Sequence, residues 1–109
     1  MSRYAIAIHG GAGTIMPSAM TPELETSYKT ALQAAMDAGY TCLMGGGTSL
    51  DAVKAAVVSL EDCILFNAGR GAVFAKDGSQ EMDASIMEGK SLMAGAVSAV
   101  RNIRNPIEL

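Results

Sequence analysis

The glycine run Gly45-Gly46-Gly47, followed at once by Thr48-Ser49-Leu50-Asp51, constrains the fold of this chain more than any other stretch. Consecutive glycines end a helix, because glycine loses the most backbone entropy in a helix and readily adopts the left-handed conformation that closes one. Thr48 with Asp51 three residues later resembles a capping box, which begins a helix. The sequence therefore predicts two helices joined by glycines alone, in an antiparallel hairpin.

Both helices have one apolar face. The first is predicted to begin at Thr21-Pro22-Glu23, because Thr can cap a helix and Pro loses no hydrogen bond at its first position. Its apolar residues recur with helical spacing, as do those of a second helix that runs to about residue 62. These residues are Leu24, Tyr28, Ala31, Leu32, Ala35 and Leu43, then Ala52, Val53, Ala56, Val57 and Leu60. Gly39 is expected to weaken the first helix, and the many alanines predict close packing of the pair.

The other apolar runs predict strands. Tyr4 to Ile8 is short, apolar and bounded by glycines, which indicates a buried strand. Residues 71–74 and 81–87, with a turn at 76–79 between them, predict a hairpin, and residues 92–100 a further strand that ends before Asn105-Pro106. The order of elements predicts an α+β or layered α/β domain in which the helical hairpin covers a mixed or antiparallel sheet.

Composition narrows the possible partners. The net charge is -3 and lysine and arginine do not cluster, so no nucleic-acid or anionic membrane partner is expected. Cys42 and Cys63 are too far apart for a CxxC motif and are expected to be free thiols in a reducing compartment. The apolar run after Met1-Ser2-Arg3 is too short for a signal peptide, which predicts a cytoplasmic protein.

The stretch His9-Gly10-Gly11-Ala12-Gly13 allows several kinds of chemistry. A phosphate loop is excluded, because residues 11–16 lack the last glycine of GxGxxG. An esterase oxyanion hole would need a GxSxG nucleophile motif, which is absent. His9 is either a general base or a hydrogen-bonded structural residue. Thr14 and Thr48 each follow a glycine, as an N-terminal nucleophile would, but neither is predicted to be one because Thr48 already caps a helix and cleavage before Thr14 would free the first strand.

Two polar residues stand out among apolar or small neighbours. Asp83 lies between Met82 and Ala84 in an expected strand, where a buried carboxylate would need defined donors. Asn67, in Phe66-Asn67-Ala68-Gly69-Arg70-Gly71, either presents its amide to a cleft or belongs to an ordinary turn. The other carboxylates between residues 62 and 88 lie near predicted turns and are expected at the surface. Their spacing does not match a calcium-binding loop.

Five segments in this order together resemble the plant-type L-asparaginases, also called isoaspartyl aminopeptidases. They are IHGGAGTI at 8–15, GGGTSLDAVKAAVVSLED at 45–62, FNAGRGAVF at 66–74, EMDASIMEGKSLMAGAVSAV at 81–100 and NPI at 105–107. The resemblance covers nearly the whole chain. Glycosylasparaginases share only the start of the second helix and fit less well.

This resemblance implies a fold and an activity. These enzymes are N-terminal nucleophile hydrolases with an αββα sandwich fold, and residues 1–109 would be one incomplete domain, the N-terminal segment of the α subunit. A threonine freed by autoproteolysis would attack L-asparagine or a β-aspartyl dipeptide, without an organic cofactor. That nucleophile would lie in sequence absent from this chain, as would the rest of the α subunit and the β subunit, so the segment alone is expected to be inactive. The complete enzyme is expected to be an oligomer of αβ units.

The resemblance also assigns roles to residues of this chain. Asn67 would support the active site beside the nucleophile, and His9, Gly10, Gly11 and Gly13 would border the substrate site. Main-chain carbonyls would bind a sodium ion, at Leu60, Glu61, Cys63, Phe66, Ala68 and Arg70. Two other interpretations stay open, a non-catalytic fragment that acts as an interaction module and, more remotely, an esterase-like hydrolase.

Overall fold

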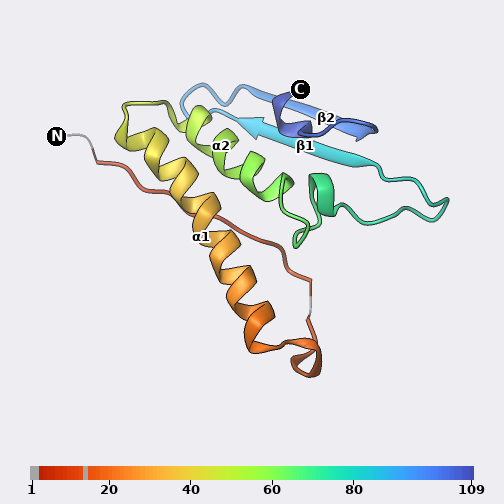
Figure 1. Ribbon diagram of the computed structural model, residues 1–109. Coiled ribbons are helices and arrows are strands. Elements are labelled where there is room, and N and C mark those ends of the chain that lie inside the picture. Colours follow the sequence, from red (N-terminus) through yellow and green to blue (C-terminus); the bar gives the residue numbers. More distant parts are fainter. Residues whose placement is uncertain (1–2, 14) are drawn as a thin grey trace.

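The computed structural model describes residues 3–13 and 15–109. Its main elements are the helices α1 (Pro22–Met44) and α2 (Ser49–Glu61) and the strands β1 (Met82–Met87) and β2 (Ala94–Val100). Short 3-10 helices lie at Pro17–Ala19, Gly69–Gly71 and Pro106–Glu108. Figure 1 shows α2 in the middle, with α1 on one side and the strand pair on the other. No helix of the described residues is both long and apolar enough to cross a lipid bilayer.

The predicted helical hairpin is confirmed, together with the signals that define it. Thr21 Oγ1 accepts a hydrogen bond from the Leu24 N–H at 3.0 Å, and Pro22 is the first residue of α1. At the start of α2, Thr48 Oγ1 accepts from the Asp51 N–H at 3.1 Å, and the Asp51 carboxylate accepts from the Thr48 N–H at 3.3 Å. The capping box is therefore complete. Gly46 has a φ of +84°, the left-handed conformation expected where the first helix ends.

Small residues form the contact between the two helices. Ala35, Ala52 and Ala56 are buried. Gly39 is buried as well, and a Cβ at this position would lie 2.3 Å from Ile6 Cδ1 and 3.0 Å from the Ala52 carbonyl oxygen. Gly39 thus costs the helix some propensity but gives the N-terminal segment and α2 the room to approach α1.

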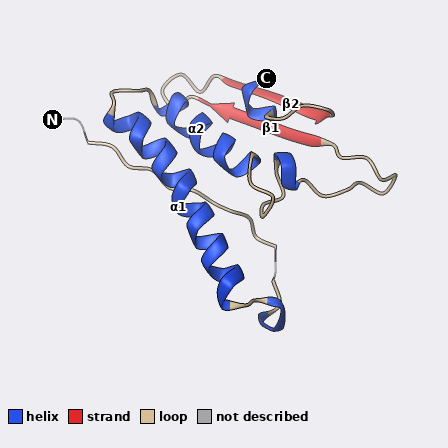
Figure 2. Cartoon of the chain, viewed as in Figure 1, coloured by secondary structure: helices blue, strands red, loops and turns tan. Residues whose placement is uncertain are grey.

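The predicted strand at residues 4–8 is wrong. This segment has no strand assignment, and Figure 2 draws it as a loop that runs along α1. Ile6 and Ile8 are half-buried while Ala5 and Ala7 are exposed, and the rings of Tyr4 and Tyr40 lie 5.5 Å apart. The apolar alternation is therefore satisfied by packing on a helix, whereas a strand would need a partner for its backbone hydrogen bonds.

The strands β1 and β2 are confirmed, and they form a two-stranded antiparallel sheet. Ala84 pairs with Val97 and Met87 with Ala94, and a bulge lies between Met82 and Ala84. The predicted strand at residues 71–74 is wrong, because side chains bind its backbone groups in place of a neighbouring strand. Asn67 Oδ1 accepts from the Val73 N–H, and Gln80 Nε2 donates to the Ala72 carbonyl.

Two helices and an antiparallel pair of strands agree with the α+β class predicted from the order of elements. They are also compatible with part of an N-terminal nucleophile hydrolase fold. The 3-10 helix Pro106–Glu108 contacts both α2 and β1. It therefore connects the helical hairpin to the sheet.

Candidate functional site

An open cleft of about 690 Å³ lies between the N-terminal segment, α1 and the loop that follows α2. His9 to Gly13 form one part of its lining, Tyr28 and Leu32 of α1 a second, and Leu65 to Ala68 a third. The structure thus brings the glycine turn and Asn67, two segments singled out from the sequence, to the same cavity. Whether they act there on a substrate stays a prediction.

The glycine turn borders the cleft because its backbone comes close to the core. A Cβ on Gly10 would lie 2.9 Å from Leu32 Cδ2 and 3.1 Å from Phe66 Cε1. Gly11 has a φ of +121°, which side chains rarely tolerate. His9 is exposed at the edge of the cleft. Glycine is therefore favoured at Gly10 by the close approach to Leu32 and Phe66, and at Gly11 by the backbone conformation.

Phe66 is the buried aromatic residue that lines the cleft. Its side chain is 6% exposed, and its ring meets the Tyr28 ring edge-on at a centroid distance of 5.9 Å. From the sequence, Tyr28 and Leu32 belong only to the apolar stripe of the first helix, and nothing in that pattern predicts that they line a site. A tyrosine in an otherwise aliphatic stripe was the available signal, because its hydroxyl favours the edge of a core.

The side chain of Asn67 has a defined orientation. Its Oδ1 accepts a hydrogen bond from the Val73 N–H at 3.0 Å. Within residues 3–13 and 15–109, its Nδ2 donates no hydrogen bond. Because the oxygen is engaged, the amide presents its NH2 group as the remaining donor, which suits the binding of an oxygen atom in the cleft.

In the segment from Leu60 to Arg70, carbonyl oxygens lie close to the glycines at 69 and 71. A Cβ at Gly69 would lie 2.3 Å from the Glu61 carbonyl oxygen, and one at Gly71 would lie 2.0 Å from that of Phe66. Leu60 and Ala68 offer carbonyl oxygens that accept from the Cys63 N–H and the Gly71 N–H. A carbonyl oxygen has a second lone pair, so each of these oxygens keeps the capacity to bind a hard cation, which prefers oxygen ligands.

Glu61 is a buried carboxylate that no sequence pattern predicted to matter through its side chain. It is 3% exposed, and it accepts from Asn105 Nδ2 at 3.3 Å and from the Ile107 N–H at 3.2 Å. Burial raises the pKa of Glu61. Hydrogen bonds from Asn105 and Arg104 lower the pKa of the neighbouring Asp62. Together, the hydrogen bonds of Glu61 and Asp62 attach the end of α2 to residues 104–107.

Asp83 lies on the exposed face of β1, although its neighbours in the sequence are apolar. It does have a defined donor, the Ala99 N–H at 2.7 Å. Ala99 has a φ of +53°, and it lies in the irregular part of β2 where Ser98 and Ala99 together face the single residue Asp83 of β1. Asp83 therefore holds an irregular part of the sheet and is not a buried acid.

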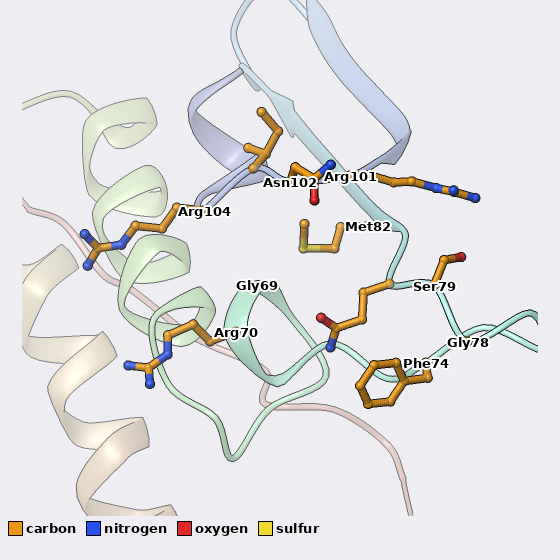
Figure 3. Close-up of a pocket in the computed structure, with 11 residues that line it drawn as sticks. Gly69, Arg70, Phe74, Gly78, Ser79, Met82, Arg101, Asn102 and Arg104 are labelled. Carbon is orange, nitrogen blue, oxygen red and sulfur yellow. The ribbon is translucent and has the colours of Figure 1, made fainter.

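A second open pocket, of about 510 Å³, is lined by three arginines, yet it is no anion clamp. Figure 3 shows the guanidinium groups of Arg70 and Arg104 directed to one side of the pocket and that of Arg101 to the opposite side. Arg104 pairs with Asp62 at 3.2 Å, and Arg101 pairs with Glu81. The positive charges thus diverge and are mostly neutralised by carboxylates.

Metal-binding side chains do not cluster in the part of the chain that the structure describes. Cys42 and Cys63 are free cysteines, as the sequence analysis expected. A cation site in these residues would therefore depend on carbonyl groups, which the loop after α2 provides.

Comparison with known proteins gives a consistent match. A family model described as "Asparaginase" matches residues 2–109. The chain is 48% identical over 107 residues to the isoaspartyl peptidase of Escherichia coli K12, which covers 98% of this chain and 33% of that protein. It is 50% identical over 104 residues to the isoaspartyl peptidase/L-asparaginase of Xenopus laevis, covering 95% and 32%. The chain therefore spans about a third of the length of these relatives, and it corresponds to their N-terminal part.

Proposed function

Because the chain belongs to the asparaginase family, we propose that it is the N-terminal segment of the α subunit of a hydrolase that cleaves β-aspartyl dipeptides and L-asparagine. The relatives named isoaspartyl peptidase and L-asparaginase support this class of substrate. The observation that supports it best is the cleft that joins the glycine turn to Asn67. Both features match the blocks by which the sequence resembles the plant-type enzymes.

In this proposal the chain forms part of the active-site wall, and residues outside this chain perform the reaction. A threonine freed by autoproteolysis in the β subunit is the nucleophile, and it attacks the side-chain amide or isopeptide carbonyl of the substrate. The NH2 group of Asn67 donates a hydrogen bond to an oxygen at that centre, since its Oδ1 is held by Val73. The glycine turn and Phe66 shape the wall against which the substrate and the β subunit pack.

A sodium ion in the loop after α2 belongs to the same proposal. The main-chain carbonyls of Leu60, Glu61, Cys63, Phe66, Ala68 and Arg70 would bind it, and the glycines at 69 and 71 allow the close approach of the loop to itself. The ion would neutralise the dipoles of converging carbonyls and so stiffen the loop that bears Asn67. No organic cofactor is needed for amide hydrolysis by a threonine nucleophile.

The complete protein is proposed to be an αββα sandwich. Residues 1–109 would contribute one helical layer and two strands to it, as a single incomplete domain. The outer face of the strand pair is rich in small residues such as Ala94, Ala96 and Ser98, which permits a second sheet to pack closely. Oligomers of αβ units are part of the same proposal.

A chimera tests the proposal. Residues 1–109 replace the matched N-terminal stretch of the E. coli isoaspartyl peptidase, and the purified product is analysed by intact mass and assayed with a β-aspartyl dipeptide. The proposal predicts a processed second chain that begins with threonine, and dipeptide hydrolysis. A folded chimera that is neither processed nor active, beside an active E. coli enzyme, would refute it.

A further inference from the structure

Glu61 contacts two other segments of the chain, the loop that follows α2 and residues 105–107. Its two carboxylate oxygens bind Asn105 and the Ile107 backbone, and its main chain lies against Gly69, whose Cβ would be 2.3 Å from the Glu61 carbonyl oxygen. Between the two bonded residues, Pro106 is fully buried. Glu61 therefore stands where α2, the loop of residues 62–71 and the 3-10 helix Pro106–Glu108 meet.

A neutral amide in place of the Glu61 carboxylate would lose one of these two hydrogen bonds. Both bonds to Glu61 come from N–H donors, so the site needs two acceptor atoms. A glutamine keeps the shape but offers one acceptor and two donors, and its NH2 group would face an N–H. Asp62 strengthens the same junction from outside, through Arg104 and Asn105.

We propose that the Glu61 side chain is a positioning residue, which sets the cation affinity of the carbonyl loop by fastening the end of α2 to residues 105–107. This inference rests on the proposed function, because it assumes the sodium site of that loop. The physical link is direct, since the same residue supplies a carbonyl to the loop and a carboxylate to the anchor. When the anchor is lost, the last turn of α2 frays and the carbonyls no longer converge.

The test uses the chimera described above, with Glu61→Gln, Glu61→Ala and Glu108→Gln. Glu108 lies in the anchored 3-10 helix and is exposed, so its variant is the matched control for loss of one carboxylate charge. Amide hydrogen exchange of residues 61–71 is measured across a sodium titration at constant ionic strength with choline. Dipeptide hydrolysis is followed in the same solutions, and the amides of α1 serve as the reference for general stability.

The proposal predicts that Glu61→Gln raises the sodium concentration for half-maximal protection of residues 61–71 on the order of tenfold. Hydrolysis should recover toward the wild-type rate at saturating sodium, Glu61→Ala should recover less, and Glu108→Gln should match the wild type. A wild-type sodium midpoint in Glu61→Gln, equal loss of protection in α1, or a wild-type loop that ignores sodium would each overturn it. Failure of the proposed function is distinct, because the unmutated chimera would then be inactive at every sodium concentration.

Discussion

At the scale of single residues, Asn67 is the side chain that we propose to donate a hydrogen bond at the reacting centre. Its oxygen is occupied by the Val73 N–H, so only its NH2 group remains to act in the cleft. Asn67→Asp keeps an acceptor for Val73 and removes the donor. In the chimera we expect the free energy of unfolding to change by less than about 0.5 kcal/mol, while kcat for dipeptide hydrolysis falls on the order of 100-fold. Steady-state kinetics beside urea unfolding check this, and an unchanged kcat would remove Asn67 from the active site.

A substitution at Gly71 tests how closely the backbone of the loop after α2 packs against itself. A Cβ there would lie 2.0 Å from the Phe66 carbonyl oxygen and 2.7 Å from that of Ile64, and both are backbone atoms that cannot move aside cheaply. Gly71→Ala is expected to cost about 1–3 kcal/mol in the free energy of unfolding. Gly89 has nothing within 4 Å of its Cβ position, so Gly89→Ala is the control and should be nearly neutral. Equal effects of the two variants in denaturant unfolding would contradict the described loop.

At the scale of elements, α1 shows that packing can outweigh helix propensity. Alanine is favoured over glycine in a helix by about 1 kcal/mol. Yet a Cβ at Gly39 would clash with Ile6 and press on the Ala52 carbonyl. We therefore expect Gly39→Ala to lower the free energy of unfolding by about 1–3 kcal/mol. A more stable variant in urea unfolding would mean that α1, α2 and the N-terminal segment are not packed as described.

The start of α2 gives a prediction about pH. Hydrogen bonds from Thr48 hold the pKa of Asp51 below its ordinary value of 3.8. Because the pKa is lower in the folded state, the carboxylate stabilises the fold above pH 3.8, and this contribution disappears as the pH falls through the folded pKa. We expect Asp51→Asn to be less stable than the wild type at neutral pH and nearly equal to it in strong acid. Unfolding curves at a series of pH values check this, and a difference independent of pH would contradict it.

The helices could be predicted from the sequence because their signals are local. Thr21, Thr48 and the glycine run each act within a few residues, and the structure confirms all three. The strands predicted at 4–8 and 71–74 were wrong, because a strand depends on a partner elsewhere in the chain, which the local sequence does not show. At Val73 a side chain took the backbone hydrogen bond that a neighbouring strand would have used.

At the scale of the whole molecule, the candidate site is a meeting point of three segments. The sequence indicated the glycine turn and Asn67, because unusual residue types mark them. The side chains of Tyr28 and Glu61 were not singled out from the sequence, since an aromatic residue in an apolar stripe and an acid at a helix end are ordinary in isolation. Their importance follows only from what the fold places against them, Phe66 for Tyr28 and residues 105–107 for Glu61.

We propose that this chain shapes an active site whose nucleophile lies in other sequence. The most direct measurement compares β-aspartyl dipeptide hydrolysis by the purified 109-residue chain with that by the chimera, at equal molar concentration. We expect no hydrolysis above buffer for the chain alone and clear turnover for the chimera. Turnover by the chain alone at the rate of the E. coli enzyme would contradict it.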